Sequence, residues 1–217
     1  MMNGWSPGRF SLATPTPDLF PLPPGETGLS AAETAAVAEA SRLVATLGGF
    51  DDDDGGFSIA CTAGVTAAEA IRRLEAVPVT DSEIEEAVRD SSESLAFVGV
   101  TDVPGGCVVV QPWGYVASNP GVMERLSVGT VCHGLYDNPK SGNQGAMARD
   151  GVIEAWDTHP GGGDASFEDP PEEILAAYLY DGEAVAYCYA EASLRPADDR
   201  SLTGKYDVWL KLPGHLL

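Results

Sequence analysis

Three histidines are the first candidates for catalysis or metal binding in this chain of 217 residues. They are His133, His159 and His215, and no two of them have the HxH or HxxxH spacing of a zinc site. In the stretch Asp157-Thr158-His159, a carboxylate lies beside an imidazole, an arrangement that orients a histidine as a general base. A polar site for small-molecule binding or hydrolysis would therefore use His133, Asp157 and His159.

Aromatic residues form a second candidate site, in the segment 111–115. Trp113 and Tyr115 follow an apolar run there, and Trp and Tyr are side chains that often anchor a bound partner. Asn143 and Gln144, in a polar stretch further along the chain, would supply the polar contacts of such a pocket. The other interpretation is that the two aromatic rings close the core.

Carboxylates are far more numerous than cations, with 33 Asp and Glu against 12 Lys and Arg, and the formal net charge is −21. Residues 50–100 contain 12 acids and 3 bases, and residues 151–200 contain 12 acids and 2 bases. Such a chain is unsuited to neutralise phosphates, so we expect no direct binding to a nucleic-acid backbone and no binding to a membrane.

Two interpretations of the acidic segments remain open. One is an ordinary solvated surface, because net charge mainly sets solubility and encounter rates. The other is a DNA mimic, in which a helix displays carboxylates at phosphate-like spacing to a basic protein. The carboxylates of that helix would be Asp81, Glu83, Glu85, Glu86 and Asp90.

The metal-binding and phosphate-binding motifs are incomplete. The run Asp51–Asp54 has the clustered oxygens that Ca²⁺ prefers, but an EF-hand loop starting at Asp51 would need an oxygen side chain at its fifth position and Glu at its twelfth. Gly55 and Thr62 occupy those positions. The stretch Gly161–Gly163 lacks the lysine of a phosphate-binding loop. We therefore expect no metal and no cofactor.

Capping patterns predict the helices that would position these residues. A Ser or Thr followed three residues later by Glu forms a capping box at a helix start. This pattern predicts helices from Thr66 to Ala76 and from Thr80 to about Arg89, and a further helix from Ser30 to Leu47. Other helices are expected over residues 119–126, 169–180 and 184–194.

Apolar runs between the helices predict strands over residues 57–61, 95–100, 107–111, 130–136, 144–149 and 152–156. Asp150-Gly151 between the last two runs indicates a two-residue hairpin. Neighbours on a strand point to opposite faces, so Cys132 and His133 cannot form a catalytic dyad. We expect an α+β fold, an antiparallel meandering sheet of five or six strands with helices before and after it.

The chain divides into two expected parts. Residues 1–28 contain six prolines and read as an N-terminal arm that lies on its own domain or on a partner. Residues 29–217 read as a single α+β domain. The four cysteines lie in apolar surroundings and are expected to be buried free thiols. With no signal-peptide pattern and no apolar run of about 18 residues, we expect a cytoplasmic location.

Two blocks of sequence carry a resemblance to a known group of proteins. The first is residues 61–74, a strand followed by Gly-Val-Thr-x-x-Glu and an Arg-Arg-Leu helix. The second is Pro112-Trp113-Gly114-Tyr115 followed by Leu-Ser-Val-Gly-Thr at residues 126–130. Over roughly residues 55–160 the chain resembles an uncharacterised family of small actinobacterial proteins, a domain of unknown function. The resemblance implies no activity.

Together these features favour a non-enzymatic cytoplasmic protein that binds another protein. The form of this function that uses the charge best is an acidic, immunity-like or counter-defence inhibitor of a basic partner that acts on nucleic acid. The alternative is a small-molecule-binding or hydrolytic domain with its site at the nearly neutral sheet.

Overall fold

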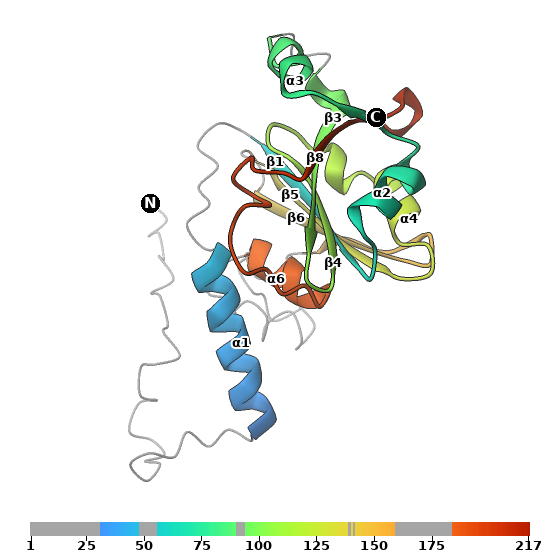
Figure 1. Ribbon diagram of the computed structural model, residues 1–217. Helices are drawn as coiled ribbons and strands as arrows, with labels where there is room; N and C mark the ends of the chain where they lie inside the picture. Colours follow the sequence, from blue (N-terminus) through green and yellow to red (C-terminus); the bar gives the residue numbers. More distant parts are fainter. Residues whose placement is uncertain (1–30, 48–55, 90–93, 139, 141, 159–183) are drawn as a thin grey trace, which may run out of the picture.

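An eight-stranded antiparallel sheet lies at the centre of the computed structural model, in which residues 31–47, 56–89, 94–138, 140, 142–158 and 184–217 are described (Figure 1). The strand order is β2-β8-β3-β4-β1-β5-β6-β7. The strands are β1 (Phe57–Ala63), β2 (Val77–Val79), β3 (Phe97–Val103), β4 (Gly106–Gln111), β5 (Val131–Asn138), β6 (Gly142–Arg149), β7 (Val152–Thr158) and β8 (Val208–Lys211).

The α+β class is confirmed, but the expected number of five or six strands is wrong. All six predicted runs form strands, and β2 and β8 are added at one edge of the sheet. These two strands have three and four residues, too few for an alternating pattern to be recognised in the sequence. The sheet meanders only through β3-β4 and β5-β6-β7, because β1 lies between β4 and β5.

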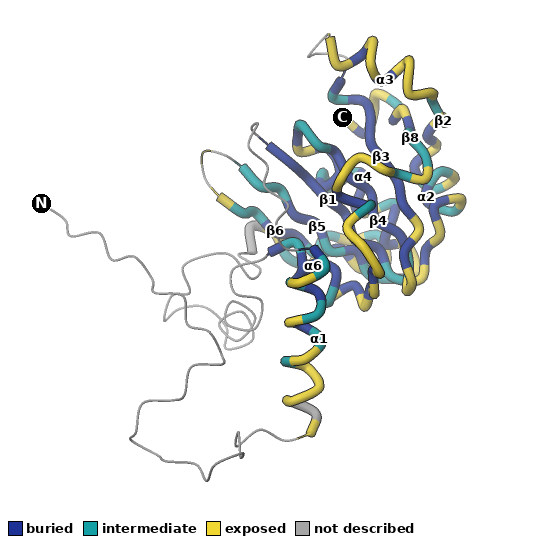
Figure 2. The backbone as a smooth tube through the Cα atoms, turned by 60° about the vertical axis from the view of Figure 1, so that its left-hand side comes forward, coloured by how far each residue is buried: buried dark blue, intermediate teal, exposed yellow. Residues whose placement is uncertain are grey.

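Helices cover both faces of the sheet. On one face lie α1 (Ala31–Leu47) and α6 (Ala184–Glu191), and on the other lie α2 (Ala67–Leu74) and α4 (Pro120–Leu126). The mostly exposed helix α3 (Asp81–Ala87) stands at one end of the molecule, beside β2 and β8 (Figure 2). Within the described residues there are also three short 3₁₀ helices, η1 (Ser94–Ala96), η2 (Val116–Ser118) and η3 (Gly214–Leu216).

The central strand β1 is buried on both sides, as Figure 2 shows by its dark blue colour. Phe57, Ile59 and Cys61 pack with α1 and α6, whereas Ala60 packs with α2 and α4. Because both faces of β1 are covered, the small polar residues Ser58 and Thr62 on it are fully buried as well.

The predicted helix starts at Thr66 and Thr80 are confirmed. Each threonine side chain accepts a hydrogen bond from the backbone N–H three residues later, and at Thr80 the carboxylate of Glu83 completes the capping box. Both helices end earlier than predicted, at Leu74 and Ala87. The N-terminal arm and the helix predicted over 169–180 lie outside the described residues. Across the described parts of the chain, no helix combines the length and the apolar character that crossing a membrane requires.

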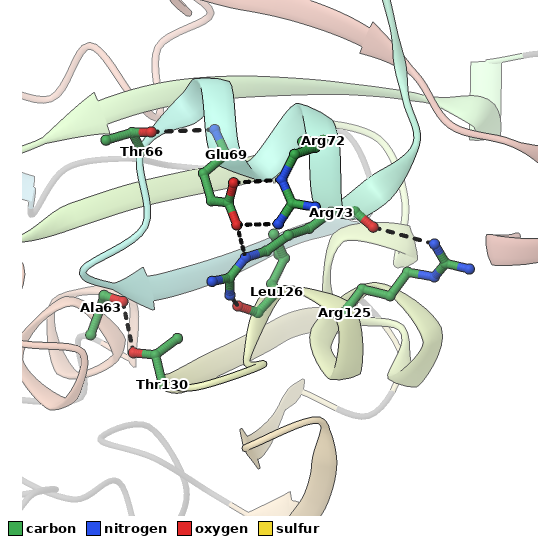
Figure 3. A network of polar contacts seen from close by, with 8 residues as sticks. All are labelled: Ala63, Thr66, Glu69, Arg72, Arg73, Arg125, Leu126 and Thr130. Carbon is green, nitrogen blue, oxygen red and sulfur yellow. Dashed lines mark hydrogen bonds and ion pairs between the residues drawn. The ribbon is translucent and has the colours of Figure 1, made fainter.

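A polar network ties α2 to α4 (Figure 3). Glu69 accepts hydrogen bonds from Arg72 and Arg73, and these bonds lower the pKa of Glu69 to about 2. Arg73 also donates to the carbonyl of Leu126, at 2.5 Å, and Arg125 donates to the carbonyl of Arg73 at 3.3 Å. The network therefore joins α2 to the last turn of α4.

Helix α4 lies close to β5 because β5 has a glycine beneath it. A Cβ atom on Gly134 would lie 2.5 Å from the Sδ atom of Met123, which is fully buried. The glycine and the arginine network together determine where α4 lies, and hence where its N-terminal end meets the sheet.

Candidate functional site

A pocket of about 310 Å³ opens beside the N-terminal end of α4, over the strands β5, β6 and β7. Three aromatic side chains line it: Tyr115, Tyr136 and Trp156. The rings of Tyr115 and Tyr136 meet edge to face with their centroids 6.1 Å apart. Such edge-to-face pairs are favourable and hold both rings in place.

The turn that carries Tyr115 is held by buried side chains. Gln111, at the end of β4, accepts a hydrogen bond from the N–H of Val116 at 2.9 Å and donates to the carbonyls of Leu95 and Phe97. Ser118 donates from its Oγ to the carbonyl of Tyr115 at 3.0 Å. Tyr115 is therefore held on a turn whose polar groups are satisfied from within the protein.

Sheet register places the other two aromatic residues. Tyr136 lies opposite Gln144 in the β5–β6 pair, and Trp156 lies opposite Ala146 in the β6–β7 pair. The β6–β7 register shifts between Gly145 and Ala146 and again between Met147 and Ala148, which leaves β7 bulged. The small residues Gly145 and Ala146 of β6 form part of the pocket wall.

Polar groups at the pocket come from the start of α4 and from β6. Asn119 caps α4, since its Oδ1 accepts from the N–H of Gly121 and its Nδ2 donates to the carbonyl of Leu216. The amide of Gln144 forms no hydrogen bond with the residues that the structure describes. Gln144 is half-buried and lines the pocket, so its amide is available to a bound group.

The pocket wall is electrically neutral over the described residues. Its other lining residues are Ser118, Asn119 and Pro120, and it includes no Asp, Glu, Lys or Arg from the described parts of the chain. Its described lining thus offers aromatic rings and hydrogen-bond acceptors without a carboxylate.

Trp113, which the sequence pairs with Tyr115 as a pocket residue, lies elsewhere. Its ring stacks on Trp209 with a centroid distance of 5.7 Å, and its Nε1–H donates to the carbonyl of Ser94 at 2.9 Å. It packs against a small core beside α3 that includes Phe97. Trp113 therefore closes the core, and only Tyr115 faces the pocket.

Of the two predicted polar residues, Asn143 and Gln144, only one lines the pocket. Gln144 lines the pocket, whereas Asn143 is not among its lining residues and lies opposite Asp137 in the β5–β6 register. Neighbouring residues of a strand face opposite sides of the sheet, which explains why only one of the two reaches the pocket.

Of the histidine site in the alternative interpretation, His133 lies away from the pocket. His133 lies on β5 two residues before Leu135, on the α1 and α6 face, and desolvation lowers its pKa to about 4. Cys132 packs on the other face, with α2 and α4, which confirms that Cys132 and His133 point apart. Asp157 follows Trp156 in β7, and His159 lies outside the described residues.

The carboxylates of α3 are exposed, as an acidic surface requires. Asp81, Glu83, Glu85 and Glu86 all face solvent, but the carboxylate of Glu83 accepts from Thr80 in the capping box. Asp90 lies outside the described residues. The helix therefore presents three carboxylates that have no capping role.

Sequence reasoning missed Tyr136 and Trp156. From the sequence, a two-residue turn at Asp150-Gly151 predicts regular pairing along the β6–β7 hairpin. Regular pairing would place Trp156 opposite Gly145, and Trp156 would then lie on the other face of the sheet from Ala146. The bulged register moves it opposite Ala146. The alternation of the strand could have indicated Tyr136. Residues 132, 134 and 136 share one face of β5, and Cys132 and Gly134 on that face pack with α4.

Comparisons with protein-family models, with curated proteins and with solved structures find no match for the chain. The resemblance to the actinobacterial family therefore stays a prediction.

Proposed function

We propose that this protein is a non-enzymatic binding module for a basic partner protein, and that the partner docks at the aromatic pocket. The observation that carries the proposal is the exposure of two large rings at one pocket. Tyr115 is 46% exposed and Trp156 is 59% exposed. Aromatic side chains that stay accessible beside a cavity are typical anchors of protein interfaces.

The apolar surface extends beyond the pocket. Val128, just after α4, is 56% exposed, and Val152, at the start of β7, is 60% exposed. The turn between β6 and β7 brings them together, since a Cβ on Gly151 would lie 3.6 Å from Val128. Helix α4 contacts β7 as well. Val152 pairs with Arg149 and lies on the other face of the sheet from Trp156, so the two valines add exposed apolar surface near the hairpin turn, and the docking proposal depends on the pocket rings themselves.

The charge distribution favours a basic partner. Seven of the described arginines are held in ion pairs with carboxylates of the same chain. The formal net charge of −21 already counts these cations, and a field of this sign steers cationic partners toward the protein.

The finer form of the proposal is an immunity-like or counter-defence inhibitor of a protein that acts on nucleic acid. The exposed carboxylates of α3 support it, because they lie on a short helix that projects from the sheet (Figure 2). In this form the carboxylates of α3 assist the encounter, and the pocket forms the contact that persists.

The test is capture from a lysate of the source organism at low and at moderate salt, read by mass spectrometry. Three baits are compared: the natural chain, Trp156→Ala, and a variant with Asp81→Asn, Glu85→Gln and Glu86→Gln. We expect one protein that the natural chain and the α3 variant retain at moderate salt and that Trp156→Ala loses. Capture that survives Trp156→Ala but not the α3 variant would contradict docking at the pocket. No specific capture at either salt would contradict the binding module itself.

Small-molecule binding is the second candidate, and the pocket volume of about 310 Å³ favours it. Pockets that hold small ligands have volumes from about 300 Å³ upward. A ligand that shifts the indole signal of Trp156 in the absence of any protein partner would support this candidate over the first.

A further inference from the structure

We infer that the aromatic pocket holds the guanidinium group of an arginine side chain from the partner protein. This inference rests on the proposed function and names the group that the pocket takes. It is carried by three features of the pocket: the aromatic rings, the amide of Gln144, which has no hydrogen-bond partner among the described residues, and the absence of a cation among the described lining residues.

The rings select a cation. Tyr115, Tyr136 and Trp156 all border one cavity, and the faces of aromatic rings carry the negative part of their quadrupole. A cation held over such a face is attracted to it, most strongly over Trp. The protein already contains one such contact, because the ammonium of Lys211 lies 5.3 Å from the ring centroid of Phe97.

The polar groups distinguish guanidinium from other cations. The carbonyl oxygen of Gln144 and the Oγ of Ser118, which donates its own proton to Tyr115, can both accept N–H donors at the pocket. A quaternary ammonium has no N–H to give them. A guanidinium has five, and its planar form allows it to stack on a ring while it donates at its edge.

Among the described lining residues there is no carboxylate, and this distinguishes arginine from lysine. An ammonium is strongly hydrated and needs a nearby anion to replace its water, whereas a guanidinium is weakly hydrated. A neutral aromatic wall therefore favours arginine, and the net charge of −21 supplies the attraction at longer range.

The test uses three blocked tripeptides that differ only at the central residue. They are acetyl-Gly-Arg-Gly-amide, its lysine counterpart and its citrulline counterpart, which keeps the shape of arginine without its charge. The full chain is titrated with each, and the indole N–H signals are followed by NMR. The signal of Trp156 is assigned by its loss in Trp156→Phe.

We expect the arginine peptide to shift the Trp156 signal saturably, and to bind about tenfold more tightly than the citrulline or lysine peptide. Trp156→Ala should weaken the arginine peptide about tenfold, and Gln144→Ala by severalfold. The α3 variant should bind it within about twofold of the natural chain at moderate salt. Both pocket residues are partly exposed, so these variants are expected to fold, as a thermal melt would verify.

Equal binding of the arginine and citrulline peptides would overturn the inference, because charge would then play no part. Equal binding of the lysine peptide would overturn the selection of guanidinium. If either result occurs while the lysate capture still depends on Trp156, the proposed function stands and only the arginine assignment falls. If, in addition, the natural chain captures no specific protein, both the proposed function and the arginine assignment are overturned.

Discussion

The side-chain oxygen of Gln111 accepts a hydrogen bond from the backbone N–H of Val116 at 2.9 Å. The same amide donates to the carbonyls of Leu95 and Phe97, and Gln111 is fully buried. One side chain thus joins the end of β4, the start of β3 and the turn that presents Tyr115.

Replacing Gln111 by Met should therefore affect both stability and the pocket. The substitution keeps an unbranched side chain but leaves one buried N–H and two carbonyls without their partner, at a cost of at least about 2 kcal/mol. Urea denaturation would measure the loss. Gln144→Ala, on the pocket wall, is the control and should change stability by about 0.5 kcal/mol or less. Equal stability of Gln111→Met and the natural chain would show that the turn is held by other contacts.

The ion-pair network of Glu69 should make stability depend on pH in acid. Hydrogen bonds from Arg72 and Arg73 lower the pKa of Glu69 from 4.5 to about 2. Because the folded state binds the proton less readily than the unfolded chain, the contribution of Glu69 is complete above about pH 4.5 and is lost as the pH falls toward 2. The urea midpoints of the natural chain and Glu69→Gln should therefore differ most near neutral pH and converge near pH 2. A difference that stays constant from pH 6 to pH 2 would contradict the lowered pKa.

His133 should remain neutral well below the ordinary range of a histidine. Desolvation lowers its pKa to about 4, with a smaller effect from Arg149. The unfolded chain takes up this proton near pH 6.5 and the folded chain only near pH 4, so stability should fall as the pH decreases between those values. An NMR titration of the His133 ring should give a midpoint near 4. A midpoint near 6.5 would mean that the ring is solvated.

The four cysteines should be unreactive in the folded protein. Cys61, Cys107, Cys132 and Cys188 are free and buried, and burial raises the pKa of each thiol. Thiolates are the reactive form, so Ellman's reagent should detect none of them in native conditions and all four in denaturant. A thiol that reacts within minutes in the native state would identify a cysteine that the fold leaves accessible.

Much of the local structure was predictable because it depends on neighbouring residues. The Thr66 cap and the Thr80 capping box set two helix starts, and the glycine at position 151 set the hairpin between β6 and β7. The burial of the cysteines followed from their apolar surroundings. These signals lie within a few residues of one another and need no distant contact.

The pocket was only partly predictable. Tyr115 and Gln144 were expected at a binding site, and both line the pocket. Trp113 was expected beside them, but its ring stacks on Trp209, which lies almost a hundred residues later in the chain. No local pattern separates an aromatic side chain that will find a distant partner from one that will stay exposed.

The sequence by itself determined six of the strands, several helix starts, the α+β class and the acidic character, because these follow from composition and from short local patterns. Tertiary structure alone decided the strand count, since β2 and β8 are short and become strands only by pairing with each other and with β3. It also decided the site. The bulged register of β7 brings Trp156 to the face of Tyr136, and the glycine at position 134 lets α4 approach that face, so the pocket exists only where these separate segments meet.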